Sequence, residues 1–533
     1  MPRMLTRWGL IALAWFALVP VVQAQFVVFT VQSVDAVLDQ VRHTMKLAGK
    51  EEEAKQLDGM LQAYLSDDGL KGLDTKRPLG LYLARFETID EKKPPVVAFV
   101  PVTNEKDFVA LLTKLNVPLS EADKDGLRHI ELGIVSIHVR FAHGHAFAAV
   151  DETQLKGELP DPAKLLTDSH RNHLLALTAN LEQMPAQLKT KLLEGLAKEM
   201  DKQAKGATTK AQQQSLKAQK YVHDALQQVL QETREISLTA HHDRQARKVR
   251  VDFSVTPRPG TNMAQQVKNF GGSRSQFAAL AEDAAMNIFL NFPIDGEIRA
   301  ALDKAIEEGF QEALKEEKSL AKKAVAEKAF AVLAPTLKSD VFDLFLTVRG
   351  PQSDGKFTLL GGLRVKNGQE IEQLLKSFLN DLPEKDRANV QVDVAKVDGL
   401  SIHRVKFPEG DKDAKRLFGS SEAFFLFHKD YALLTVGTYG LEELKKAVSR
   451  INTPGQKQFA PLHMTFALRQ LMHFEENDAK RAKATAAAKT AFSGDGQDVI
   501  QITWAGDTTL RLRFEMSDQI IKFLALLGDE GGE

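Results

Sequence analysis

The chain repeats one pattern of apolar and polar positions four times, a strand-like alternation that runs into a helix-like spacing. In each copy apolar residues take every second position, a polar turn follows, and apolar residues then recur every three or four positions. Self-similarity of this kind indicates duplication and predicts the architecture better than a single motif does. The strand and helix of each copy occupy Pro95–Leu115, Lys248–Phe270, Lys356–Phe378 and Thr509–Leu527.

Each copy belongs to a longer unit, which we predict as strand, long helix, hairpin and shorter helix. The long helix of the third unit is expected to run from Pro293 to about Leu333, because apolar residues recur at intervals of four and an Ala- and Lys-rich stretch extends them. Units one and three carry an additional β-meander that units two and four lack, His129–Val150 in unit one and Val397–Phe407 with Ala423–Val436 in unit three. This alternation indicates that a block of two units was itself duplicated.

We therefore predict an α+β protein with antiparallel sheets and long amphipathic helices, internally duplicated as four units in two similar halves. Strands that alternate strictly, such as Val249–Phe253, have one solvated face, so each sheet is expected to carry helices on one face only. The predicted domains are residues 1–24, a signal peptide, residues 25–284, the first half, and residues 285–533, the second half. The polar stretch Lys202–Lys220 predicts a solvated excursion, with a partner-binding arm as the alternative.

The first 24 residues read as a targeting segment. Arg3 and Arg7 precede the apolar run Trp8–Val22, which has the length of a signal-peptide core and is short for a membrane span. Small residues at Val22 and Ala24 predict cleavage after Ala24, with an uncleaved anchor as the alternative. No later segment is apolar enough to span a bilayer, so we expect an exported protein of the periplasm or cell envelope.

Composition narrows the classes of function. Lys plus Arg (70) nearly balance Asp plus Glu (71), so no net field attracts nucleic acid, and nucleic acid is not expected as a partner. The chain has no cysteine, which excludes disulfides, thiolate nucleophiles and thiolate metal sites. Phe is abundant (30) while Tyr (5) and Trp (3) are scarce, which favours apolar cores or an apolar pocket over carbohydrate stacking.

No catalytic, cofactor-binding or metal-binding residue can be singled out. The segment Gly350–Phe357 has the glycine spacing of a phosphate loop, but it ends in Phe and joins two predicted strands, so we interpret it as a turn. His143 and His145 flank Gly144 in a turn and are expected to project to one side. Without a third ligand they are interpreted as surface histidines, together with His129 and His138, and the third unit retains only His403.

His241 and His242 precede Asp243 at a predicted hairpin tip. Neighbouring residues of a strand point to opposite faces, so we do not expect the two histidines to hold one ion. No cofactor is predicted.

The segment from Pro78 to Leu112, which contains PLGLYL and PVVAFVPVTNEKDFVALL, resembles a set of exported bacterial proteins classed as domains of unknown function. The signal peptide and the lack of cysteine agree with that resemblance. Its motifs are structural, so it implies an envelope location and supplies no catalytic residue.

Three functions follow from these observations. The first is a non-enzymatic binding or scaffold protein that acts through its surface, with an unknown protein as partner. The second is a carrier of an apolar ligand such as lipid, in a cavity between sheet and helices. The third is a hydrolase with a site between the two halves. For the carrier, the cavity is expected to be lined by Phe342, Phe345, Phe424, Phe425 and Phe427.

Overall fold

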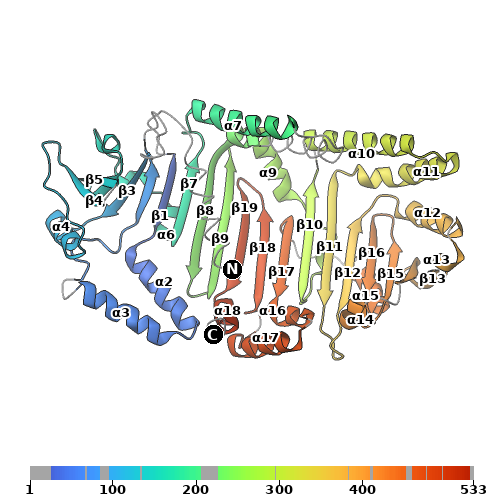
Figure 1. Cartoon of the computed structure of the whole chain (residues 1–533). Helices are drawn as coiled ribbons and strands as arrows, with labels where there is room; N and C mark the ends of the chain where they lie inside the picture. The colour runs from blue at the N-terminus through green and yellow to red at the C-terminus, as the bar shows by residue number, and fades with distance from the viewer. Residues whose placement is uncertain are drawn as a thin grey trace. The chain divides into compact units, whose positions relative to one another are not determined.

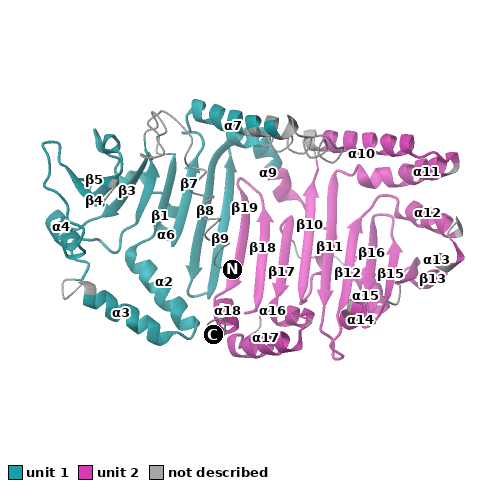
Figure 2. Ribbon diagram, in the orientation of Figure 1, with its two compact units in different colours: residues 1–266 teal, residues 267–533 magenta. Residues whose placement is uncertain are grey.

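The computed structural model describes residues 26–528 except 66–68, 85–94, 133–134, 206–225, 295, 382, 408–411, 452–458, 476 and 495. The chain divides into two compact units, residues 1–266 and residues 267–533 (Figure 2). The predicted signal peptide and most of the polar stretch Lys202–Lys220 lie outside the described residues. The domain boundary predicted near Ala284 stays a prediction.

Unit 1 contains an antiparallel sheet (Figure 1). Its strands are β1 (Val27–Val31), β2 (Leu79–Leu83), β3 (Val96–Pro101), β4 (Leu127–Leu132), β5 (Val135–Ala142), β6 (His145–Ala149), β7 (Leu175–Asn180), β8 (Thr233–Asp243) and β9 (Lys248–Pro257). Across the sheet they follow the order β9-β8-β7-β1-β2-β3-β6-β5-β4. The central strand β1 is therefore paired on one side with β2 and on the other with β7.

The helices of unit 1 follow its strands in the predicted alternation. They are α2 (Val34–Leu47), α3 (Glu51–Leu65), α4 (Glu105–Lys114), η1 (Glu152–Leu155), α5 (Pro162–Leu165), α6 (Asp168–Asn172), α7 (Ala186–Lys205) and α9 (Asn262–Gly272), which contains the point of division. Side-chain caps explain two of the starts: Ser33 accepts from the amide of Ala36, and Asn104 accepts from the amide of Asp107.

Unit 2 also contains an antiparallel sheet. Its strands are β10 (Met286–Pro293), β11 (Val341–Arg349), β12 (Thr358–Arg364), β13 (Val390–Val397), β14 (Leu400–Lys406), β15 (Glu422–Phe427), β16 (Tyr431–Val436), β17 (Leu462–Ala467), β18 (Val499–Ala505) and β19 (Leu510–Ser517). Their order is β19-β18-β17-β10-β11-β12-β16-β15-β14-β13. The antiparallel α+β architecture predicted from the sequence is confirmed in both units.

The helices of unit 2 are η2 (Ala278–Leu280), α10 (Gly296–Glu316), α11 (Leu320–Leu337), α12 (Gly368–Asp381), α13 (Glu384–Arg387), α14 (Lys412–Phe418), α15 (Gly440–Ile451), α16 (Leu468–Leu471), η3 (Met472–Phe474), α17 (Asp478–Ala491) and α18 (Gln519–Gly528). The single long helix predicted to Leu333 is wrong, because α10 ends at Glu316 and Ser319 caps a new helix by accepting from the amide of Lys322. The two helices fold back on each other, and the rings of Phe310 and Phe330 stack with centroids 3.9 Å apart.

The core of unit 2 lies between its sheet and α15. Phe289, Phe345 and Leu360 are almost fully buried on one face of the central strands, together with Leu444 and Val448 of α15. In unit 1 the equivalent layer is formed by Phe99, Phe147 and Leu155, where η1 packs on the sheet.

Helices also lie on the opposite faces, so the prediction of helices on one face only is wrong. In unit 1, α4 packs Phe108 and Leu111 against Ala146, whereas the neighbouring Phe147 points to the η1 side. In unit 2, α12 contacts β15 on the side of Phe425, whereas Phe424 faces α15. Each sheet buries part of both faces because helices reach it from both sides.

We expect Phe289→Ala to lower the free energy of unfolding by about 3–5 kcal/mol, because it removes a fully buried ring that packs against Phe345. Urea unfolding of the chain from residue 25 onward, followed by the fluorescence of Trp504, measures this change in unit 2. Leu320→Ala, at a position 82% exposed, is the control and should change the free energy by less than about 0.5 kcal/mol. Equal losses in both variants would contradict the placement of the core.

Candidate functional site: the open face of each sheet

The strand register of unit 2 places apolar residues in two uninterrupted rows on the face of Ile288, which we call its open face. Neither row contains a charged side chain, and the indole N–H of Trp504 is their one side-chain hydrogen-bond donor. The first row is Phe514, Ile502, Met464, Ile288, Leu346, Gly361, Leu434 and Phe425, and the second is Leu512, Trp504, Leu462, Leu290, Leu344, Leu363, Ala432 and Phe427.

Unit 1 has an open face of the same kind, on the side of Phe29. Here too the register joins apolar residues from strand to strand without a charged side chain between them. One row is Phe253, Leu238, Leu177, Phe29, Leu81, Ala98 and Ala148, and the next is Val251, Ala240, Leu175, Val31 and Leu79.

Helices cover only parts of these faces. In unit 1, Leu188 of α7 packs against Val27 at the start of β1, and α4 covers the part of the sheet formed by β3 and β6. On β8 and β9, at the other end of the sheet, large apolar side chains remain in contact with water: Leu238 is 43% exposed and Phe253 42%. In unit 2, Leu434 is 41% exposed. Contiguous exposed apolar patches are characteristic of protein–protein or membrane interaction sites and of ligand-binding grooves.

The five phenylalanines expected to line one cavity divide between two faces. Phe345 and Phe424 are buried in the core beneath α15, whereas Phe425 and Phe427 belong to the rows of the open face. Phe342 is 38% exposed, next to the same face. The predicted common cavity is therefore wrong, because successive strand residues alternate between faces.

The histidines of the β4–β6 meander do not converge. His143 contacts the carbonyl oxygen of Leu159 through Nε2 at 3.1 Å, and His145 contacts the carbonyl oxygen of His143 through Nδ1 at 2.8 Å. His145 is buried between Phe99 and Phe147, and this burial lowers its pKa. The interpretation of His145 as a surface histidine is wrong, because it is only 6% exposed.

His129 and His138 occupy opposite positions of the β4–β5 pair. His129 Nδ1 lies 3.0 Å from the hydroxyl of Ser120, an ordinary surface contact. Of the clusters of metal-ligating side chains found in the described part of the chain, none contains a histidine of this meander.

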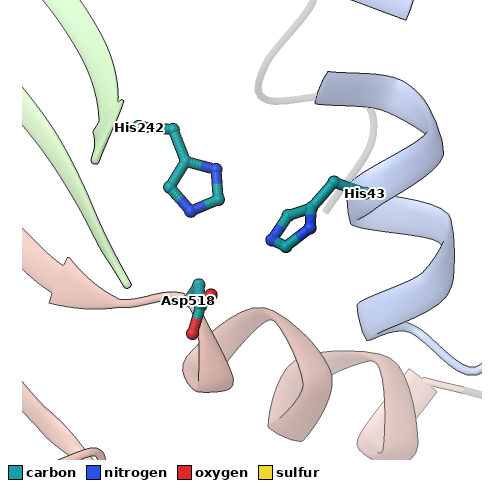
Figure 3. A group of neighbouring side chains, drawn as sticks. All are labelled: His43, His242 and Asp518. Atoms are coloured by element: carbon teal, nitrogen blue, oxygen red, sulfur yellow. The ribbon is translucent and has the colours of Figure 1, made fainter. Parts of the chain in front are cut away.

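His241 and His242 diverge as predicted. His242 lies beside His43 of α2, with ring centroids 4.9 Å apart (Figure 3), and its Nδ1 is 2.9 Å from the Oε1 of Gln40. The ring of His241 instead lies 5.7 Å from that of His173. Alternation along β8 therefore prevents the pair from sharing one ion.

Unit 2 contains one cluster that sequence reasoning missed. Glu372 and Lys376 of α12 meet Asp393 and the fully buried His403 of the β13–β14 hairpin. The ammonium of Lys376 lies 2.8 Å from Glu372 and 2.9 Å from Asp393, and His403 Nε2 lies 3.2 Å from Glu372 Oε1. These ion pairs raise the pKa of Lys376.

The hydrogen bonds of His403 oppose metal binding at this cluster. The backbone N–H of Asp393 donates to Nδ1 of His403 at 3.2 Å, so the proton of the neutral ring is on Nε2. A metal at Nε2 needs a free lone pair there, and Lys376 already supplies the positive charge between the two carboxylates. The cluster is an ion network that fastens α12 to the hairpin.

The segment Gly350–Phe357 connects β11 to β12 as a hairpin turn, as predicted, and it is not followed by a helix. It therefore lacks the helix N-terminus that a phosphate loop requires.

Comparison with known proteins adds no relative: no family model matches the chain, and neither a curated protein nor a solved structure shows significant similarity to it. Within the described residues, none of the helices combines the length and the apolar composition needed to cross a membrane. The function is therefore argued from the residues of this chain.

We expect the free energy of unfolding to fall as the pH is lowered below about 6.5. Burial lowers the pKa of His403 in the folded protein, whereas the unfolded chain binds that proton near the ordinary value of 6.5. Stability is thus complete above pH 6.5 and is lost as the pH falls toward the folded pKa. In His403→Gln this loss should be smaller, by up to about 1.4 kcal/mol per pH unit.

Urea unfolding at pH 8, 7, 6 and 5, followed by Trp504 fluorescence, measures both slopes. The pH 8 comparison isolates the cost of the substitution itself, because the imidazole is neutral in both states there. Identical slopes in the two proteins would show that His403 is not held neutral by its surroundings.

Proposed function

We propose that the chain is a non-enzymatic, exported binding protein of the cell envelope that carries an apolar ligand, with the acyl chains of lipids as the ligand class. One observation carries this proposal: the apolar rows of the open faces, which lack charged side chains and stay partly exposed. Water contact with such rows is unfavourable by about 25 cal/mol for each Å² of apolar area, and a bound hydrocarbon removes it.

The chemistry of the rows favours hydrocarbon over a protein partner. Protein–protein interfaces contain about one hydrogen bond per 100–200 Å². The rows of unit 2 offer one side-chain donor, on the half-buried Trp504, and no charge. With a strand spacing of about 4.8 Å, a row of eight positions spans roughly 34 Å. This exceeds the half-thickness of a bilayer core, about 15 Å, so an extended acyl chain fits along a row.

Duplication is part of the same proposal. It is supported by the order of the strands in the two sheets. When the strands of unit 1 are counted from β9 and those of unit 2 from β19, the first nine strands of the two sheets are connected in the same order. Unit 2 adds β13 at its edge. Two copies of one module give the carrier two apolar faces.

Export by the signal peptide remains part of the proposal. The scaffold function, with a protein partner, is the competing outcome of the test below. A hydrolase between the halves stays a prediction.

The test uses Trp504, which lies in the second row of unit 2 and is the one tryptophan of the chain after residue 24. Dibrominated stearate, added below its micelle concentration, should quench Trp504 fluorescence in the protein from residue 25 onward, and unbrominated stearate should not. Leu512→Glu should weaken this binding at least about tenfold, because it puts a charge beside Trp504 in an apolar row. Leu512 is 39% exposed, so the variant is expected to fold.

Thr508→Glu is the matched control, because it adds the same charge at the exposed hairpin tip between β18 and β19, outside the rows. It should bind stearate like the unsubstituted protein. Absence of quenching, or an equal affinity in Leu512→Glu, would overturn the carrier. A stoichiometric protein in native mass spectra of the purified envelope fraction, with no lipid, would favour the scaffold instead.

A further inference from the structure

Unit 1 contains a cleft on the side of its sheet opposite the open face. The cleft has a volume of about 1230 Å³, larger than typical ligand pockets of about 300–1,000 Å³. Its floor is formed by β1, β2 and β7 and its wall by the segment between β6 and α6. Phe26, Val28, Tyr82, Leu159 and Leu165 form an apolar patch within a lining that is otherwise largely polar and charged.

Polar contacts from β5 and the adjoining turn hold the wall in place. Arg140 donates to the carbonyl oxygens of Leu155 at 2.7 Å and Gly157 at 2.6 Å. His143, from the β5–β6 turn, contacts the carbonyl oxygen of Leu159. The cleft is therefore preformed by contacts between the wall and the sheet, and a ligand does not need to order it.

The buried histidine of the cleft, His170, has both ring nitrogens next to polar partners. His170 is 1% exposed, and its Nδ1 accepts from the amide of Thr167 at 3.1 Å. Its proton is therefore on Nε2, which lies 3.1 Å from the hydroxyl of Thr178. Burial lowers the pKa of His170, so the ring stays neutral. This histidine supports the wall and offers neither a base nor a metal ligand.

Tyr82 differs from these residues because its polar group has no partner. It is 2% exposed, it lines the cleft, and its hydroxyl has no hydrogen bond with any of the described residues. Burial strongly raises the pKa of Tyr82, so the hydroxyl remains protonated and can donate. Tyr82 lines the open cleft, where a ligand acceptor can take the hydrogen bond of its hydroxyl in place of water.

The rim carries charges of both signs. Lys156 is paired with Glu152 at 2.8 Å, and Lys164 stands on the same rim as Glu158 and Glu235. Such a rim creates no field that selects a charged ligand over a neutral one.

We propose that this cleft binds a small uncharged amphiphile, whose apolar body lies on Val28, Leu159 and Leu165 and whose carbonyl, ether or hydroxyl oxygen accepts from the Tyr82 hydroxyl. The site is separate from the open face of unit 1, since Tyr82 and Leu81 point to opposite sides of β2. It is therefore independent of the carrier function proposed above.

Two probes with the same ring system test this site: methyl naphthyl ketone, which has an acceptor, and ethylnaphthalene, which has none. Equilibrium dialysis with the protein from residue 25 onward should give about fivefold tighter binding of the ketone, the size of one hydrogen bond. Tyr82→Phe should remove this preference, because it deletes the donor alone and leaves the ring in place.

Tyr431→Phe is the matched control. Tyr431 is also 2% exposed and its hydroxyl is also unpartnered, but it is packed in the core of unit 2 against Phe277. The ketone preference should survive in this variant. Both variants keep the aromatic ring and delete only a hydroxyl that has no hydrogen bond with the described residues, so both are expected to fold.

Leu238→Glu separates the cleft from the open face of unit 1, because Leu238 belongs to a row of that face. Ketone binding in the cleft should be unchanged in this variant. The proposal would be overturned by equal binding of the two probes, by a ketone preference that persists in Tyr82→Phe, or by ketone binding that disappears only in Leu238→Glu. None of these outcomes would decide whether acyl chains bind in unit 2.

Discussion

The alternation of side chains across paired strands is the constraint on which each unit depends. With no cysteine in the chain, stability comes from burial and hydrogen bonding. The register that places Phe289 and Phe345 under α15 also places Ile288 and Leu346 on the open face. Both faces of the central strands are apolar, and the helices cover one of them more fully. The core and the exposed rows are thus two results of one pairing pattern.

Polar residues on the face of the unit 2 sheet that α15 covers are also fixed by the strand register. Asp343 is fully buried on β11, where it accepts from the hydroxyl of Ser275 at 2.7 Å and from the amide of Gln276 at 2.9 Å. Burial raises the pKa of this carboxyl in spite of those bonds. Arg349, at the end of the same strand, forms an ion pair with Glu443 of α15. Buried polar groups paired in this way favour one register over others, because a shift of one residue would leave them without partners.

Much of the secondary structure could be predicted from the sequence, because strand alternation and helical spacing are local signals. The break between α10 and α11 was missed although Ser319 is a good N-cap, since the apolar spacing continued on both sides of it. The grouping of the five phenylalanines failed for a reason that the sequence already contained: Phe424 and Phe425 are neighbours on one strand. Because successive side chains of a strand point to opposite faces, these two rings cannot line the same cavity.

The clusters of side chains were beyond sequence reasoning for a different reason. Glu372 and Lys376 form a recognisable pair one helical turn apart, but Asp393 and His403 join them from a distant hairpin whose register shifts between Gln391 and Ala395. The cleft likewise depends on Tyr82 and His170, which are far apart in sequence. Contacts of this range follow from topology, and a single sequence carries no local record of them.

The position of β1 has a consequence for the order in which the chain assembles. β1 begins at Val27 and needs β7, at Leu175–Asn180, to complete its pairing on one side. During synthesis, β1 therefore waits for more than half of its unit to follow, and β10 waits in the same way for β17. Until then its apolar edge is unpaired and prone to wrong association. The pairing order thus leaves the central strand of each unit incomplete until late in the synthesis of that unit.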